Sequence, residues 1–191
     1  MKWSLYLLLM LSGLLASGCR QSSRGSLPAG WAVMGSSPRD YAVSVIPGAH
    51  GHIVSIKDAH FFTDGFGAAA RTTPAGPYRH RRLQLSAVMT TQSVASWATM
   101  WMRVDGRKKA LAFDNMNNRR LSGTTGERTY SITLDVPADA ESIVYGVMLN
   151  GRGSATMKQI VLREVGREVP STDLLPDLQQ RSKPCNCKAD L

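Results

Sequence analysis

Two tryptophans and an arginine recur at even spacing in a stretch that alternates between polar and apolar residues. Trp97, Trp101 and Arg103 fall on one face of a strand predicted over residues 96–105, because strand side chains change face at every residue. The opposite face is apolar and is expected to face the core; it carries Ala98, Met100, Met102 and Val104. Aromatic rings beside polar groups suit a sugar, whose ring faces are apolar and whose edges carry hydroxyl groups. If both faces of the strand are covered, the rings belong to the core instead; we expect one buried ring and one partly exposed ring.

A polar loop follows the next predicted strand. Asp114, Asn115 and Arg119 supply a carboxylate, an amide and a guanidinium, which can bind sugar hydroxyls in pairs. The same groups can instead brace the loop by hydrogen-bonding its backbone, and we favour this reading because Asn and Asp are common turn residues. We expect the segment 115–125 to form a wall beside the exposed tryptophan.

The N-terminus has the features of an export signal. Lys2 precedes an almost continuously apolar run over residues 5–15, which is too short to span a membrane as a mature helix. The run Leu15-Ala16-Ser17-Gly18-Cys19 resembles the lipobox of bacterial lipoproteins. The resemblance implies that residues 1–18 are a signal peptide, and that Cys19 carries acyl chains such as palmitate and anchors the chain to a membrane. Arg20 follows the cysteine, which by the same resemblance favours the periplasmic side of the outer membrane in a Gram-negative host. The alternative is an ordinary cleaved signal with a chance cysteine.

Two further cysteines lie near the C-terminus. Cys185 and Cys187 would meet an oxidising compartment in an exported chain, so we predict a disulfide, within the chain or to another chain. A soft metal would need more ligands than this segment offers, and we predict neither a metal site nor a cofactor.

The net charge of +9 would ordinarily suggest nucleic acid as a partner. Export argues against that partner, and favours anionic lipid headgroups, lipopolysaccharide phosphates or acidic envelope polymers. Three cationic clusters, at residues 79–82, 107–109 and 119–120, would form an anion-binding surface if they met on one side. The alternative is scattered charge that keeps the chain soluble. The sequence leaves the oligomeric state open.

The chain between residues 30 and 165 predicts an all-β fold. Short runs of period two alternate with Gly, Pro, Asn and Asp, and we find no helical stripe. Asp105-Gly106 and Asn150-Gly151 predict hairpin turns, the second more strongly. About ten strands at this spacing indicate a two-sheet antiparallel β-sandwich. The predicted strands are residues 31–34, 41–46, 52–57, 66–72, 82–91, 96–105, 110–113, 130–136, 143–149 and 155–165.

Two flanking segments complete the predicted organisation. Residues 19–29 are a flexible tether of Ser, Arg, Gly, Gln and Pro. Residues 166–191 are a mobile tail broken by three prolines, with one short helical turn near residues 173–180.

Several motifs in the predicted sandwich resemble a poorly characterised bacterial domain that stands alone or is attached to regulatory proteins. They are Trp101-Met102-Arg103-Val104-Asp105-Gly106, Ala112-Phe113-Asp114-Asn115-Met116, Gly123-Thr124-Thr125, Leu134-Asp135-Val136-Pro137 and Gly146-Val147-Met148-Leu149. The resemblance covers residues 41–165 and implies a galactose-binding-type jelly roll, the architecture of many carbohydrate-binding modules. Where that domain has an aspartate and a tryptophan after the third motif, this chain has Gly126 and Glu127. Where an aromatic and an acidic pair are common near the last strand, it has Thr156, Met157, Lys158 and Gln159, so a groove lined there would be altered.

Recognised catalytic motifs are missing from the sequence. It has no nucleophile elbow, no phosphate-binding glycine loop and no zinc-protease helix motif. We therefore predict a lipid-anchored, non-catalytic module that binds an envelope glycan or another polar or anionic ligand. The first alternative is a structural or protein-interaction lipoprotein without a sugar site. The second is a glycan-acting enzyme, which would need two carboxylates at a fixed separation.

Overall fold

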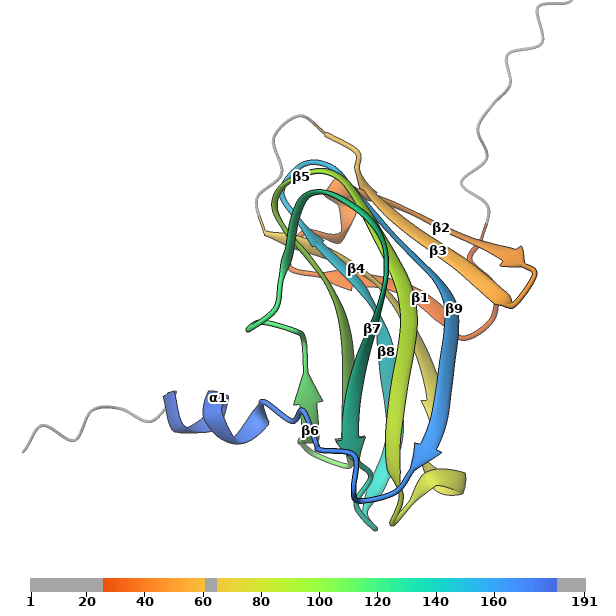
Figure 1. The fold of residues 1–191 in the computed structure, drawn as a ribbon, viewed down its shortest axis with the longest axis vertical. Helices are drawn as coiled ribbons and strands as arrows, with labels where there is room; N and C mark the ends of the chain where they lie inside the picture. Colours follow the sequence, from red (N-terminus) through yellow and green to blue (C-terminus); the bar gives the residue numbers. More distant parts are fainter. Residues whose placement is uncertain (1–25, 61–64, 182–191) are drawn as a thin grey trace, which may run out of the picture.

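A computed structural model describes residues 26–60 and 65–181 of the chain. In these ranges the chain forms nine strands, two short 3-10 helices and one α-helix (Figure 1). The strands are β1 (Trp31–Gly35), β2 (Tyr41–Gly48), β3 (Gly51–Asp58), β4 (Phe66–Pro74), β5 (Arg82–Gly106), β6 (Ala110–Asp114), β7 (Leu121–Asp135), β8 (Ala140–Asn150) and β9 (Ser154–Val165). The helices are η1 (Pro38–Asp40), η2 (Gly76–Tyr78) and α1 (Leu175–Arg181). The predicted signal segment, Cys19, Cys185 and Cys187 lie outside the described residues.

The strands form one antiparallel sheet that folds over on itself. Its order is β1-β4-β8-β5-β9-β3-β2, with β6 and β7 also paired to β5. The second half of β5 pairs with β8 and β6, whereas its first half pairs with β9 and β7. We call β1, β4, β8, β6 and the second half of β5 sheet I, and β2, β3, β9, β7 and the first half of β5 sheet II. The fold is therefore the predicted all-β, two-sheet antiparallel sandwich.

β5 is the strand that joins the two sheets. It has 25 residues and bends over the top of the molecule together with β7 (Figure 1). The ladder between them shifts register three times between Met89 and Ala98, and Ser93 takes a φ of 50° within this bend. Such bulges bend a strand without ending its pairing. We predicted two strands here, 82–91 and 96–105, because the polar residues between them break the alternation.

Two other sequence predictions are wrong because of long-range pairing. β7 begins at Leu121, not near residue 130, because its first residues pair with the bend of β5. Asn150-Gly151 is not a hairpin turn, because β8 and β9 belong to different sheets and β5 lies between them. A hairpin does form close to the predicted turn at Asp105-Gly106, because β5 pairs with β6, but both residues still belong to β5 and the connection is residues 107–109.

The inner faces of the two sheets enclose a continuous apolar core. Ala98, Met100, Met102 and Val104 are fully buried in it, which confirms the predicted core face of this strand. Sheet II contributes alternate residues of β5 and β7, among them Leu83, Leu85, Met89, Ile132 and Leu134. Leu27 packs partly buried against this core, so the predicted tether makes contact with the domain before residue 30.

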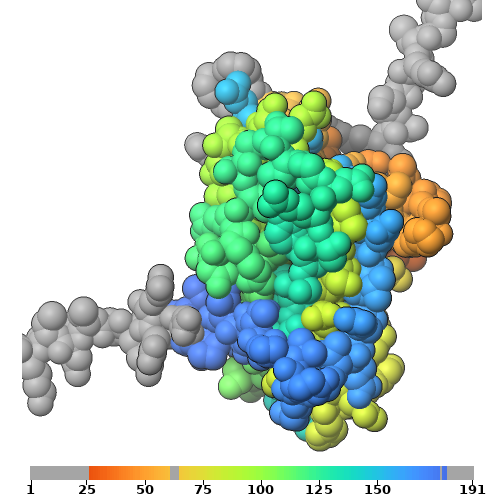
Figure 2. Space-filling view, viewed as in Figure 1, coloured from red at the N-terminus to blue at the C-terminus, as the bar shows by residue number. Residues whose placement is uncertain are grey.

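The segment after β9 is packed, contrary to the predicted mobile tail. Thr172 donates its backbone N–H to the Thr133 carbonyl at 2.8 Å, and its hydroxyl accepts the Thr133 N–H at 3.0 Å. The backbone N–H of Leu174 donates to the Phe113 carbonyl at 2.7 Å. Asp173 accepts the N–H groups of Phe113 and Leu175, both at 2.9 Å, so it also stabilises the start of α1. The segment, blue in Figure 2, covers the lower part of the visible face, and α1 confirms the predicted helical turn.

An ion pair holds the first part of this segment. Arg82 binds both carboxylate oxygens of Asp135 at 2.8 Å and donates to the Val169 carbonyl at 2.8 Å. The hydrogen bond from Arg82 lowers the pKa of Asp135 below its ordinary value. Arg82 is the first residue of β5 and Asp135 is the last residue of β7. The pair therefore holds the segment after β9 against the ends of these two strands.

In the part of the chain that the structure describes, no helix is both long enough and apolar enough to cross a membrane.

Candidate ligand-binding face

The outer face of sheet I carries the predicted aromatic residues, and we call it the tryptophan face. Register places Trp97 opposite Asn150, Thr99 opposite Met148, Trp101 opposite Gly146 and Arg103 opposite Val144 on β8. β4 continues these rows with Phe66, Ala68, Ala70 and Thr72. On the other side, Phe113 of β6 lies opposite Arg103. The face therefore combines aromatic, small and polar side chains.

Trp101 is buried in this face, with 1% of its surface exposed. Its row contains Gly146 and Ala70, whose lack of bulk leaves room for an indole to lie across the strands. It belongs to a small apolar cluster with Ala68, Ala70, Val144 and Met148, separate from the main core. Trp101 is therefore part of the scaffold of the face, and its ring is not an exposed stacking surface.

Trp97 is half-buried on the same strand, where β5 leaves its bend. Its ring lies 6.2 Å from that of Phe66, and the guanidinium carbon of Arg120 lies 5.0 Å from its centroid. Arg120 is exposed and also donates to Asn117, so the loop before β7 reaches over the ring. One tryptophan is thus buried and the other partly exposed, as predicted. The predicted wall consists of residues 115–120, because β7 already begins at residue 121.

Among the described residues, two buried polar atoms on this face have neither a hydrogen-bond nor an ion-pair partner. They are Thr99 Oγ1 and Trp101 Nε1, and both residues are 1% exposed. A buried polar atom without a partner costs about 1–3 kcal/mol, so native proteins usually satisfy such atoms with protein, water or ligand. The two residues are two apart on β5 and hence on the same face, but both atoms are enclosed by their neighbours, so a polar molecule could reach them only after side chains move.

Arg103 shares the face but is already engaged. Its guanidinium forms an ion pair with Asp105, with 2.7 Å between Nε and Oδ1 and 2.9 Å between Nη2 and Oδ2. The pair is partly exposed. Arg103 therefore keeps donors toward the solvent while Asp105 fixes its orientation.

The structure removes Asp114 from the predicted binding set. It lies opposite Met102, on the core side of β6, and its side chain is 0% exposed. Its carboxylate accepts the Met116 N–H at 2.7 Å and pairs with Arg119 at 2.6 Å. Asn115 accepts the backbone N–H of Asn117 at 3.2 Å. Asp114, Asn115 and Arg119 therefore brace the loop, which is the alternative that the sequence favoured.

Sequence reasoning missed three residues of this face. Phe66 and Phe113 are partly buried against the Trp101 cluster, and Arg120 covers Trp97. Phe113 lies between Ala112 and Asp114 in the sequence, so the alternation of a strand could have placed it on the opposite face from these two residues. The contact of Arg120 depends on how the loop folds, and its residue type alone did not distinguish it from Arg119.

The cationic clusters do not form one strongly positive surface. Because β5 bends back, residues 79–82 and 107–109 lie near the same end of the sandwich, whereas Arg120 lies by Trp97. Arg81 pairs with Glu164 and Arg82 with Asp135. Asp139, in the turn before β8, and Glu141, at the start of β8, are exposed at the same end, so the charge there is mixed.

Two of the positions at which this chain departs from the bacterial domain that its sequence resembles contact each other. Lys158 of β9 and Glu127 of β7 form an ion pair at 2.5 Å on the outer face of sheet II. A groove altered by these residues would therefore lie on sheet II and not on the tryptophan face.

Comparison with known proteins gives one sequence relative and a fold. No family model matches the chain. A stretch of 101 residues is 45% identical to the uncharacterized HTH-type transcriptional regulator YbfP of Bacillus subtilis; it covers 52% of this chain and 34% of that protein. The chain thus spans about a third of the length of this relative. The enzymatically active domain of tailspike protein 4 from bacteriophage CBA120 superposes with a TM-score of 0.51 at 12% identity, over 72% of this chain and 20% of that one. A xylan-binding domain of Paenibacillus barcinonensis gives a TM-score of 0.49 at 8% identity, over 74% and 90%.

The chain is a jelly-roll β-sandwich. The tailspike domain shares its architecture and little of its sequence, so it supports the fold alone.

Proposed function

We propose that this chain is a lipid-anchored, non-catalytic binding module of the bacterial envelope that recognises a glycan on the tryptophan face. The observation that carries the proposal is the row Trp97, Thr99 and Trp101. It joins a partly exposed indole to two buried polar atoms that lack partners. A sugar ring matches this combination, because its apolar face packs on an aromatic ring and its hydroxyls pair with donors and acceptors.

Arg120 is the hydrogen-bond donor at the edge of this proposed site. Its guanidinium stacks on Trp97 and still has several N–H groups that face outward. A ligand hydroxyl or carboxylate accepts from these groups while its ring contacts the rim of the indole. Arg103, held by Asp105, serves the other end of the row.

A recognition module fits the relative better than a self-contained enzyme does. The matched stretch covers about a third of a longer chain that is named as a transcriptional regulator and not as an enzyme. Among the described residues of the tryptophan face, the acidic side chain beside the row is Asp105, and it is committed to Arg103. Glycosidase chemistry needs two carboxylates about 5–10 Å apart across the substrate, so we do not propose catalysis at this face.

The membrane anchor belongs to the same proposal. The lipobox-like run before Cys19 supports acylation of that cysteine, and Arg20 supports placement on the periplasmic side of an outer membrane if the host has one. The polar segment after Cys19 would then let the sandwich stand off the membrane and reach a glycan.

A glycan array probed with the purified chain tests the function, followed by calorimetric titration of the best-binding glycan. We expect Trp97→Ala to weaken binding at least about tenfold, corresponding to roughly 1.4 kcal/mol. The matched control is Val161→Ala, which removes an apolar side chain that is 47% exposed on sheet II. If no glycan binds, or if Trp97→Ala binds like the control, the tryptophan face is not a sugar site and the protein-interaction alternative takes its place.

A further inference from the structure

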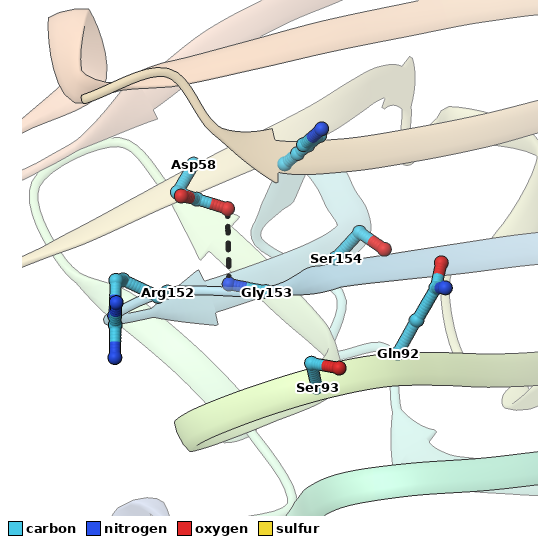
Figure 3. A pocket seen from close by; sticks show the side chains of 7 residues that line it. Asp58, Gln92, Ser93, Arg152, Gly153 and Ser154 are labelled. Atoms are coloured by element: carbon cyan, nitrogen blue, oxygen red, sulfur yellow. Dashed lines mark hydrogen bonds between the residues drawn. The ribbon is translucent and has the colours of Figure 1, made fainter. Parts of the chain in front are cut away.

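A hollow lies at the top of the sandwich, on sheet II and not on the tryptophan face. It has a volume of about 430 Å³, within the usual range of small-molecule sites. Its walls come from the end of β3, the bend of β5 and the turn between β8 and β9 (Figure 3). The residues that line it are Lys57, Asp58, Gln92, Ser93, Arg152, Gly153 and Ser154.

Three of these residues form a row across neighbouring strands. Ser154 of β9 lies opposite Lys57 of β3 on one side and opposite Gln92 of β5 on the other. Side chains directly opposite in a sheet stand about 5 Å apart on one face, so the ammonium, hydroxyl and amide project together into the hollow. Lys57 and Gln92 are exposed, and Ser154 is half-buried between them.

The backbone around this row is held in place. Asp58 accepts the Gly153 N–H at 3.0 Å on its side chain and donates its own N–H to the Gly153 carbonyl at 3.2 Å (Figure 3). Gly153 has a φ of 113°, and a Cβ there would lie 2.6 Å from the Ser93 carbonyl oxygen. Ser93 takes a φ of 50° and donates its backbone N–H to the Thr124 hydroxyl at 3.0 Å. The turn between β8 and β9 therefore approaches the bend of β5 too closely for any residue but glycine at position 153. These contacts hold the walls in place, so the site is formed before a ligand arrives.

We infer that this hollow binds a small hydroxylated anion of monosaccharide size, such as a sugar acid or a sugar phosphate. Lys57 and Arg152 bring two positive charges to its walls and Asp58 brings one negative charge, so the lining carries a net charge of +1; the Asp58 carboxylate also accepts the Gly153 N–H. Gln92, Ser93 and Ser154 offer donors and acceptors for ligand hydroxyls. None of the described residues that line it is aromatic, so charge and hydrogen bonds, not ring stacking, select the ligand. This site goes beyond the proposed function and does not depend on it.

Calorimetric and NMR titrations of the full chain test the inference with three probes: glucuronate, glucose 6-phosphate and neutral glucose. We expect at least one anionic probe to bind saturably, at a Kd on the order of 1 mM or tighter, and glucose not to bind. Lys57→Gln should weaken the anionic probe about tenfold, because a charge-assisted hydrogen bond is lost. Higher salt should weaken binding as well. The carboxylate and phosphate arms show which anion the site prefers.

The matched control is Lys108→Gln, which removes the same charge from the exposed turn between β5 and β6 at the opposite end of the sandwich. Two outcomes overturn the inference: saturable binding of neither anionic probe, or equal weakening by Lys57→Gln and Lys108→Gln. Equal binding of glucose overturns the requirement for an anion. Melting curves of both variants establish that they are folded. Trp97→Ala should leave this titration unchanged, so failure here is distinct from failure of the glycan site.

Discussion

At the scale of single residues, the two tryptophans of β5 have different tasks although they share a face. Trp101 is surrounded by a cluster built on small neighbours, whereas Trp97 is half-buried at the end of the row and lies under Arg120. The burial of each ring thus depends on what the neighbouring strands place beside it. Register puts a glycine beside Trp101 and an asparagine beside Trp97.

This difference predicts two different stability costs. Trp101→Ala should lower the free energy of unfolding by about 3–5 kcal/mol, the usual result of emptying a buried aromatic site. Trp97→Ala should lower it by less than about 2 kcal/mol, because the ring is only partly removed from water. Chemical denaturation of the two variants measures both values. Equal losses would mean that Trp97 is also scaffold and would remove the main support for the glycan site.

The buried carboxylate of Asp114 makes a second prediction at this scale. Asp114→Ala should cost about 3–5 kcal/mol, because it leaves Arg119 without its buried partner and the Met116 N–H without an acceptor. Asp114→Asn should cost less, since an amide oxygen still accepts from Met116. Denaturation of both variants, with exposed Asp139→Ala as the control, checks the order. A loss no larger than that of the control would contradict the bracing role.

At the scale of elements, the C-terminal segment acts as an added layer on the strand edges. Thr172 and Leu174 hydrogen-bond to β7 and β6, and Arg82 holds Val169. The segment therefore joins elements from both sheets, because β6 belongs to sheet I and the second half of β7 to sheet II. Pro170 and Pro176, which lie in its described part, limit regular structure but do not prevent it from packing.

Removing this segment should destabilise the sandwich. A chain that ends at Val165 should melt several degrees below a chain that ends at Arg181, because several backbone hydrogen bonds of about 0.5–1.5 kcal/mol each are lost. Asp173→Ala is a milder variant, which unpairs the N–H groups of Phe113 and Leu175 and should lower the melting temperature less. Differential scanning calorimetry measures all three. Identical melting temperatures would restore the mobile tail that the sequence predicts.

At the scale of the whole molecule, the fold is one sheet bent into two layers by β5 and β7. β5 bends over the top of the sandwich, and both of its ends lie at the opposite end (Figure 1). Its bend lines the hollow, and its second half carries the tryptophan face, so one strand contributes to both candidate sites. The two candidate sites nevertheless lie on different sheets.

The proposed anchor gives a prediction for the whole chain. Cys19→Ser should move the protein from the membrane fraction to the soluble fraction, or leave it unprocessed, because several acyl chains are needed for firm attachment. Cell fractionation with immunoblotting detects the change, and Cys185→Ser, which removes a cysteine outside the lipobox-like run, is the matched control. A processed Cys19→Ser protein that stays in the membrane fraction would refute the lipid anchor.

The sequence by itself determined the class of the fold, the positions of most strands and the core face of residues 98–104. These features are local, because period-two alternation reports which side of a strand is buried. It also predicted the helical turn near residue 175 and the bracing role of Asp114.

The tertiary structure alone decided the continuity of β5 and β7, the packed C-terminal segment and the fate of each tryptophan. It also decided that Asn150-Gly151 connects two sheets, and that Arg120 and not Arg119 covers Trp97. These features depend on pairing between residues far apart in the chain. A strand's own alternation shows that one face is covered, but only the register against β4, β6 and β8 shows whether that cover is a glycine, a phenylalanine or an arginine.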